Sequence, residues 1–111
     1  MILPCESEAD FHRMLADSQT RPVFLLKHST RCPISAAAQA QYSRFAAAHA
    51  DVECWQVLVI EQRAISNLVA EETDITHQSP QVMLLQGGKP VWSASHQSIT
   101  EAALTIALES R

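Results

Sequence analysis

The alternation of apolar and polar positions along the chain predicts short strands that alternate with helices. A continuous apolar run from Pro22 to Leu26 is typical of a strand covered on both faces. Apolar residues spaced for one face, such as Ile65, Leu68 and Val69, indicate helices elsewhere. The predicted order is helix 7–18, strand 22–28, helix 33–49, strand 52–60, helix 62–72, strand 81–86, strand 90–94 and helix 99–109.

Local signals support several of these element ends. Ser7, with Asp10 three residues later, has the spacing of an N-terminal helix cap. The adjacent Gly87 and Gly88 tolerate the positive φ angles of a tight hairpin turn. Pro90 cannot donate a backbone hydrogen bond, so the strand that it begins is expected at the edge of the sheet.

The order of the elements predicts an α/β fold. A strand–helix–strand unit forms a right-handed parallel crossover, and the later hairpin then extends the same sheet in the antiparallel direction. This is the thioredoxin-like arrangement, a four-stranded mixed sheet flanked by four helices. The length of 111 residues suits a single domain over residues 1–111.

Composition and charge exclude several classes of function. The net charge is −4 and the eight Lys and Arg residues are scattered, which argues against a nucleic-acid partner. No apolar run approaches the roughly 20 residues that span a bilayer, and the start does not resemble a signal peptide. Neither a membrane partner nor export is therefore expected, and the predicted location is cytoplasmic. The three cysteines and five histidines show no metal-ligand spacing, so no metal site is predicted.

Cys32 is the principal candidate for chemistry. It lies between a predicted buried strand and a predicted helix, and Pro33 fits the first helical position because its missing N–H costs nothing there. Unpaired backbone N–H groups and the helix dipole at this end favour a thiolate over a thiol. Ser35 stands where a CxxC motif would carry its second sulfur, so the sequence predicts a nucleophile that works with one thiol.

The predicted topology brings later segments to the same sulfur. Strand 81–86, antiparallel to strand 22–28, would begin at the edge where Cys32 lies, which places Ser79 and Pro80 close to it. Strand 90–94 would then return to that edge and bring residues 95–98 there. Three segments that are far apart in sequence are thus expected to converge.

Three stretches of the chain resemble the YtxJ-like monothiol bacilliredoxins, a branch of the thioredoxin superfamily. The resemblance covers about Phe11 to Ala107 and is carried by Lys27-His28-Ser29-Thr30 with Cys32-Pro33-Ile34-Ser35, by Ser79-Pro80-Gln81, and by Val91-Trp92-Ser93-Ala94-Ser95-His96 followed by Ile99-Thr100. The family is linked to bacillithiol, a low-molecular-weight thiol. The resemblance implies that Cys32 removes bacillithiol from mixed disulfides on S-thiolated client proteins, with no tightly bound cofactor and with free bacillithiol as co-substrate.

The resemblance also implies roles for individual residues. The expected catalytic set is Cys32, Pro33, Ser35, Lys27 and His28, and the expected substrate-binding set is Thr30, Ser79, Pro80, Ser95, His96 and Ser98. A cis peptide bond is expected before Pro80, and the start of the last helix, taken as residues 95–98, is expected to bind a carboxylate of the thiol. Lys27 and His28 are candidates for holding the thiolate, although adjacent strand residues face opposite sides. Ser35 is a candidate donor to the sulfur.

Alternatives stay open at the level of sequence. A monothiol protein can carry an iron–sulfur cluster between two subunits, although Pro33 stands where such glutaredoxins usually have glycine. A non-catalytic redox sensor would be modified at Cys32 without turnover. Cys54 is expected in the core, and Cys5 on a mobile N-terminus is a candidate resolving thiol. Glutathione or coenzyme A could replace bacillithiol, and a monomer is expected.

Overall fold

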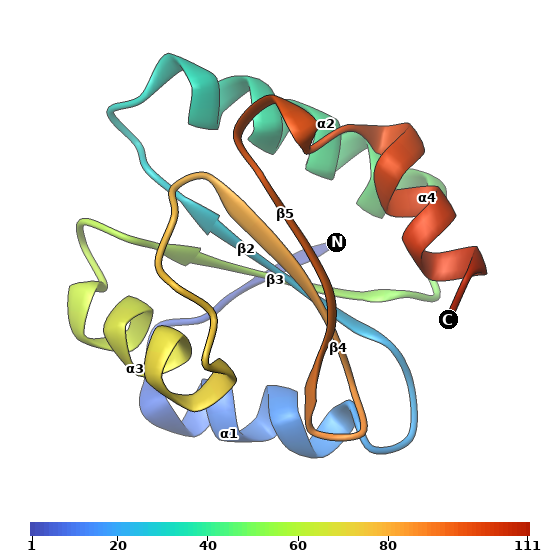
Figure 1. The fold of residues 1–111 in the computed structure, drawn as a ribbon, viewed down its shortest axis with the longest axis horizontal. Helices are drawn as coiled ribbons and strands as arrows, with labels where there is room; N and C mark the ends of the chain where they lie inside the picture. Colours follow the sequence, from blue (N-terminus) through green and yellow to red (C-terminus); the bar gives the residue numbers. More distant parts are fainter.

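A five-stranded mixed sheet forms the middle layer of the protein (Figure 1). The computed structural model describes residues 1–111. The strands follow the spatial order β1-β3-β2-β4-β5. Their bounds are β1 (Ile2–Pro4), β2 (Val23–His28), β3 (Glu53–Leu58), β4 (Gln81–Gln86) and β5 (Lys89–Ser95). The helices are α1 (Glu8–Asp17), α2 (Pro33–Ala48), α3 (Arg63–Thr73) and α4 (Glu101–Glu109), with a 3₁₀ turn η1 (His96–Ser98).

Strand directions confirm the predicted topology. β1, β3 and β2 are parallel to one another, whereas β4 pairs antiparallel with β2 and β5 antiparallel with β4. β5 is an edge strand, as Pro90 predicted. Because β4 begins where β2 ends, Lys27 pairs with Gln81 across this ladder. The fold is thioredoxin-like.

The prediction of four strands was wrong by one, since Ile2–Pro4 adds a fifth strand. This segment pairs with β3, with Ile2 opposite Cys54 and Pro4 opposite Gln56. Three residues that include a proline carry no recognisable strand pattern of their own. The strand forms because β3 offers an unpaired parallel edge to it, which is a property of the tertiary structure.

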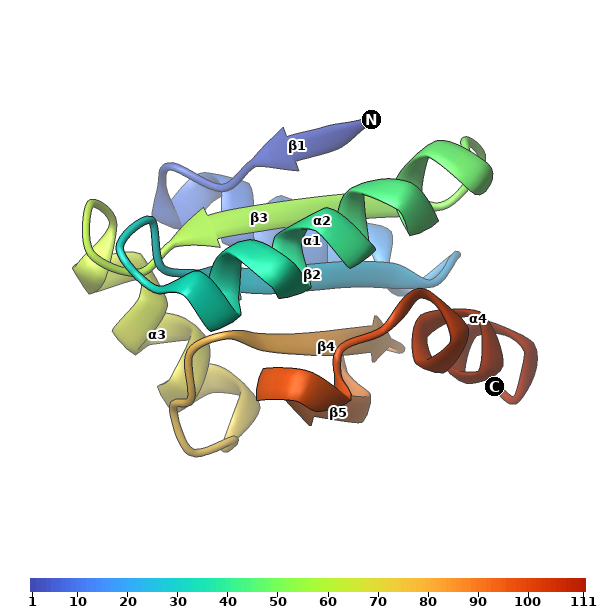
Figure 2. The ribbon, with the colours of Figure 1, turned by 90° about the horizontal axis from the view of Figure 1, so that it is seen from above.

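Two helical layers cover the sheet (Figures 1 and 2). α1 and α3 lie on one face, and α2 and α4 lie on the other. Phe24 and Leu26 point into the core beneath α2 and α4, whereas Val23 and Leu25 point into the core beneath α1 and α3. Both faces of β2 are therefore buried, which explains the continuous apolar run in its sequence.

The helix ends agree with prediction at α1 but not at α4. Ser7 caps α1, and its hydroxyl accepts a hydrogen bond from the Asp10 N–H at 3.1 Å. The last helix was predicted from residue 99, but Ile99 is extended and buried, and Thr100 is the N-cap. The Ile99 side chain packs into the core beneath α4, and this packing sets the later start. None of the helices has the length and apolar character needed to cross a membrane.

Candidate functional site

Cys32 lies at the start of α2, as predicted. It is the N-cap residue, with extended φ and ψ angles of −113° and 122°, and Pro33 follows at the first helical position. The Cys32 carbonyl accepts the Ala36 N–H at 3.0 Å, and the Cys32 N–H donates to the Ser29 carbonyl across a turn at 3.4 Å. The thiol is free, partly exposed and without a capping hydrogen bond. The Cys32 side chain thus lies at the start of α2, where it leaves the first-turn N–H groups without a side-chain cap.

The Ser35 hydroxyl lies beneath this turn and is fully buried. Its oxygen accepts the Ser29 N–H at 2.8 Å and lies 2.8 Å from His28 Nδ1. The sequence suggested a hydrogen bond from the Ser35 hydroxyl to the Cys32 sulfur. In the structure the hydroxyl bonds to His28 and Ser29 instead. Ser35 ties the end of β2 to the first turn of α2.

His28 and Lys27 lie on opposite faces of the sheet. The hydrogen bond to Ser35 places His28 on the side of α2. Burial lowers the pKa of His28, and the Ser35 hydrogen bond and the Glu61 charge partly oppose this effect. By the alternation of β2, Lys27 points to the side of α1 and α3. The structure therefore brings His28, and not Lys27, to the side of the sheet that carries Cys32.

Lys27 is a fully buried cation with an unpaired ammonium group. Its side chain is 0% exposed, and Nζ has no hydrogen-bond partner. Burial lowers the pKa of Lys27 from 10.5 to about 8. Gln81, its partner across the β2–β4 ladder, also has a buried amide oxygen without a partner. Two neighbouring polar groups thus remain unsatisfied at this edge of the sheet.

The segment before β4 reaches the same edge. The peptide bond between Ser79 and Pro80 is cis, as expected. The β2–β4 register, continued by one residue, sets Pro80 opposite His28. The His96 N–H donates to the Pro80 carbonyl at 3.0 Å, which attaches the end of β5 to this segment. The predicted convergence of three segments at the Cys32 edge is confirmed by the strand pairing.

A groove of about 380 Å³ lies beside Cys32, between the first half of α2 and the segment that joins β5 to α4. On the α2 side it is lined by one helical stripe at spacing i, i+3, i+4 and i+7. The lining residues are Pro33, Ile34, Ala37, Ala38, Gln41, His96, Gln97, Ile99 and Thr100. Sequence reasoning found Pro33 and His96 but missed the α2 stripe, although Ile34 is a large apolar residue that stays 39% exposed.

The other expected substrate-binding residues have different surroundings. Ser95 is the last residue of β5 and Ser98 closes η1, and neither lines the groove. The Thr30 hydroxyl donates to a Glu61 carboxylate oxygen at 3.0 Å. Of residues 95–98, which were taken as the start of the last helix, the last three form the 3₁₀ turn η1. The first N–H of α4, that of Glu101, donates to the Gln41 side chain at 2.8 Å. Because that N–H already has a partner within the protein, it is not free to bind a carboxylate of the thiol.

His96 holds an unusual backbone conformation where the chain enters the groove. Its φ angle is +54°, in the left-handed region that residues other than glycine rarely adopt. Such strain persists only where the surrounding structure fixes it, and it occurs often at functional sites. The bond from the His96 N–H to Pro80 provides part of that constraint.

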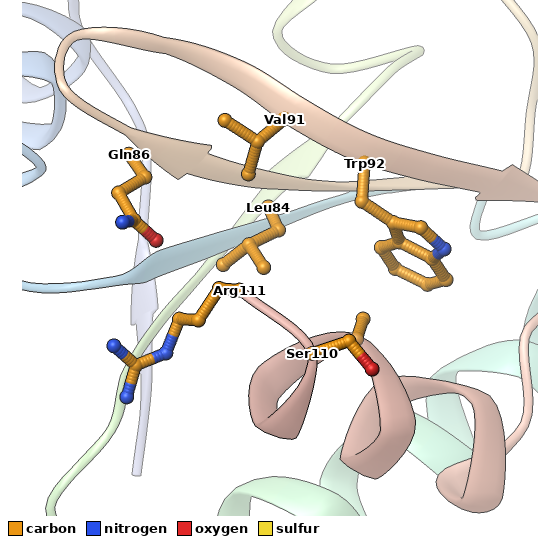
Figure 3. Close-up of a pocket in the computed structure, with 7 residues that line it drawn as sticks. Leu84, Gln86, Val91, Trp92, Ser110 and Arg111 are labelled. Atoms are coloured by element: carbon orange, nitrogen blue, oxygen red, sulfur yellow. The ribbon is translucent and has the colours of Figure 1, made fainter.

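A second hollow of about 300 Å³ lies at the opposite end of β4 (Figure 3). Leu84, Gln86 and Trp92 line it together with the end of α4. Gln86 is the last residue of β4, whereas Pro80, which lies opposite His28, comes just before its first residue. This hollow is therefore too far along the sheet to serve Cys32.

The two other cysteines are buried. Cys5 and Cys54 are each 1% exposed, and burial raises the pKa of Cys5 to about 12 and that of Cys54 to about 11. The expectation that Cys5 lies on a mobile N-terminus was wrong. It follows β1, and its N–H donates to the Gln56 carbonyl at 2.8 Å. Cys32 is the accessible thiol of the protein.

Comparison with known proteins identifies the family. The sequence model of monothiol bacilliredoxin BrxC matches residues 4–104. This chain belongs to the monothiol bacilliredoxin family. A solved thioredoxin-fold structure assigned to an oxidoreductase is 31% identical to this bacilliredoxin, with a TM-score of 0.88, over 96% of this chain and 92% of that one.

More distant structures share the fold of this bacilliredoxin. Thioredoxin from Malassezia sympodialis has a TM-score of 0.78 at 15% identity, over 99% of this chain and 90% of its own. Thioredoxin from Fasciola hepatica has a TM-score of 0.78 at 16% identity, over 98% of both chains. Family and fold together support a thiol oxidoreductase. No group of three or more His, Cys, Asp or Glu side chains is placed to hold a metal ion.

Proposed function

We propose that this bacilliredoxin uses Cys32 to remove bacillithiol from mixed disulfides on client proteins. The observation that carries the proposal is the position of one accessible thiol at the N-cap of α2, with the Ser35 hydroxyl where a second thiol would lie. A single thiol can accept an adduct but cannot expel it internally. Resolution therefore requires a thiol from outside the protein.

The proposed reaction is two successive disulfide exchanges. The Cys32 thiolate attacks the bacillithiol sulfur of the client disulfide, and the client leaves as a thiolate that takes a proton from solvent. Cys32 then carries bacillithiol as a mixed disulfide. A second bacillithiol thiolate attacks that adduct, which releases bacillithiol disulfide and restores the Cys32 thiolate. Electrons balance because each step exchanges one thiolate for another.

The groove beside Pro33 is the proposed place for the adduct. Its α2 wall is apolar apart from Gln41, and its opposite wall offers polar groups of His96, Gln97 and Thr100. The segment at Ser79 and Pro80 would present its backbone to the bound thiol or client. We propose that the protein acts as a monomer in the cytoplasm, where free thiols are kept reduced.

The proposal is tested by intact-mass analysis and peptide mapping. Reduced protein is exposed separately to bacillithiol disulfide, to glutathione disulfide and to a client protein that carries bacillithiol. The expected result is a fast single adduct on Cys32 from the bacillithiol donors, which excess bacillithiol releases. Cys32→Ser should form no adduct, whereas Cys54→Ser should behave as the native protein because that sulfur is buried.

Each other outcome has its own meaning. Slow and equal labelling of Cys5 and Cys54 would contradict the proposed nucleophile. An equal adduct from glutathione disulfide would keep the exchange chemistry but contradict bacillithiol as the specific thiol. An adduct that excess thiol does not release would favour a redox sensor over a catalyst.

A further inference from the structure

Gln41 lies at the end of the groove that is farthest along α2 from Cys32. It lines the α2 wall, and the rise of the helix places it about 12 Å along the axis from Pro33. The Gln41 Oε1 atom accepts the Glu101 N–H at 2.8 Å, and Glu101 directly follows Thr100, which lines the opposite wall. This hydrogen bond therefore joins the two walls of the groove at that end.

The same hydrogen bond decides which atom of the Gln41 amide is left for a bound molecule. A backbone N–H can donate only to the amide oxygen, so Oε1 is held by α4 and the nitrogen Nε2 remains. Nε2 carries two N–H donors, and no group of the protein accepts a hydrogen bond from them. Because Gln41 is half-buried and lines the groove, these donors are available to a molecule inside it.

The charges around this amide favour an anionic oxygen as its partner. Glu101 is the first residue of α4, so its N–H belongs to the positive end of that helix. Hydrogen bonds in a chain polarise one another, so donation from Glu101 to Gln41 Oε1 strengthens donation from Gln41 Nε2. No acidic residue lines the groove, and the Glu101 carboxylate is paired with Arg44 at 3.7 Å.

We infer that Gln41 is a specificity-determining residue whose amide nitrogen binds a carboxylate of the low-molecular-weight thiol. This role rests on the proposed function, because it places the far end of a thiol whose sulfur is attached to Cys32. Helical side chains lean toward the helix N-terminus, so the carboxylate reaches Gln41 if roughly 10 Å of the thiol separates it from the sulfur. The groove thus selects a thiol by the position of its carboxylate.

The α2 wall between Cys32 and Gln41 offers no other polar side chain. It consists of Pro33, Ile34, Ala37 and Ala38. Such a surface packs against the carbon atoms of a ligand but does not fix its orientation, which falls to the few polar groups of a site. On this wall, an adduct is therefore held at two points, by the disulfide to Cys32 and by the amide of Gln41.

The test is the binding of S-methyl bacillithiol, which cannot take part in disulfide exchange, to the ¹⁵N-labelled protein. Titration should shift the NMR signals of the Gln41 side-chain NH₂ group. Gln41→Leu and Gln41→Glu should each weaken binding about tenfold, because each removes a hydrogen bond to a carboxylate. Gln41→Glu keeps an acceptor for the Glu101 N–H, so it separates ligand binding from the attachment of α4.

Ala40→Glu is the matched control. Ala40 is the exposed neighbour of Gln41 on α2 and does not line the groove, so this variant adds the same charge to the helix outside the site. It should bind S-methyl bacillithiol as the native protein does. If Gln41→Leu does not fold, Gln41→Glu and this control decide.

The kinetics of adduct formation on Cys32 supply a second readout. With bacillithiol disulfide, the Gln41 variants should need about a tenfold higher concentration for the half-maximal rate, with the limiting rate unchanged. Hydroxyethyl disulfide is too short to reach Gln41, so the variants should react with it as the native protein does. Equal slowing with both disulfides would contradict the assigned role, because it would indicate a general disturbance around Cys32.

Two binding results would overturn the role of Gln41. One is a set of Gln41 side-chain signals that neither S-methyl bacillithiol nor S-methyl glutathione shifts, and the other is an unchanged affinity in Gln41→Glu. Binding of S-methyl glutathione that depends equally on Gln41 would support the role but contradict bacillithiol as the specific thiol. Since S-methyl ligands bind without exchange, the role of Gln41 and the proposed reaction can fail separately.

Discussion

Lys27 and His28 are adjacent at the end of β2 but have opposite environments. His28 forms a hydrogen bond with Ser35 on the α2 side, whereas the Lys27 ammonium is buried on the other side without a partner. Strand alternation makes this division unavoidable, because neighbouring side chains point to opposite faces. Burying an unpaired charge costs stability. Lys27 therefore makes stability depend on pH.

Lys27→Met should stabilise the protein at neutral pH. The folded pKa of Lys27 is about 8, against 10.5 for the unfolded chain. Lys27 thereby contributes a rise in the free energy of unfolding between pH 8 and 10.5, because its unfolded form binds more protons there. The buried Cys5 and Cys54 thiols oppose this rise, since their folded pKa values are raised. At about 1.4 kcal/mol per pKa unit, the full penalty is about 3 kcal/mol below that range, and methionine removes it. Urea unfolding at several pH values measures the change.

Lys89→Met is the matched control, since Lys89 is the other lysine and is exposed on β5. The difference in the free energy of unfolding between this control and the native protein should not change between pH 8 and 10.5. A Lys27→Met variant whose gain in stability over the native protein is the same at pH 8 and at pH 10.5 would show that the ammonium is not buried without a partner.

At the scale of elements, helix α1 has a side-chain cap and helix α2 does not. Ser7 closes α1 through the Asp10 N–H, whereas the Cys32 side chain makes no such bond at α2. Serine is among the strongest N-cap residues. Helix α1 is thus stabilised locally, while the first turn of α2 has no side-chain cap at Cys32.

Ser7→Ala should lower the free energy of unfolding by about 1 kcal/mol, because it removes the acceptor for the Asp10 N–H. Ser7→Asp should retain most of the stability, since a carboxylate also caps and interacts favourably with the helix dipole. Thermal and urea unfolding measure both variants. Equal losses in the alanine and aspartate variants would contradict a capping role for the hydroxyl.

At the scale of the whole molecule, β2 is the central strand of the sheet and is enclosed on all sides. β3 and β4 pair with its two edges, and a helical layer covers each of its faces. β1 and β5 are the two edge strands, each paired on one side only. The candidate site is thus attached to the central strand, because β2 leads directly to Cys32.

Hydrogen exchange should follow this order of enclosure. Amides of β2 should exchange most slowly, since their opening requires global unfolding, and amides of β1 and β5 should exchange faster through local opening. Native-state exchange followed by NMR measures the two classes. Protection in β5 equal to that in β2 would mean that the hairpin opens only with the whole sheet.

Local patterns in the sequence were enough for much of this protein. The apolar run from Pro22 to Leu26 predicted β2, Ser7 predicted the cap of α1, and the Cys32-Pro33 step predicted the start of α2. These features are fixed by chain geometry and by side chains close in sequence, so the sequence expresses them directly. Once the strand order was inferred, the approach of Ser79 and Pro80 to the Cys32 edge followed from it.

Only the tertiary structure decided the features that depend on distant partners. β1 exists because β3 has a free edge, and α4 starts late because Ile99 packs into the core. The groove beside Cys32 requires α2 and the chain after β5 to lie side by side. The His28–Ser35 bond and the unpaired Lys27 follow from which face of β2 each residue occupies. Distance, burial and hydrogen-bond partners are properties of the assembled chain, and no local pattern encodes them.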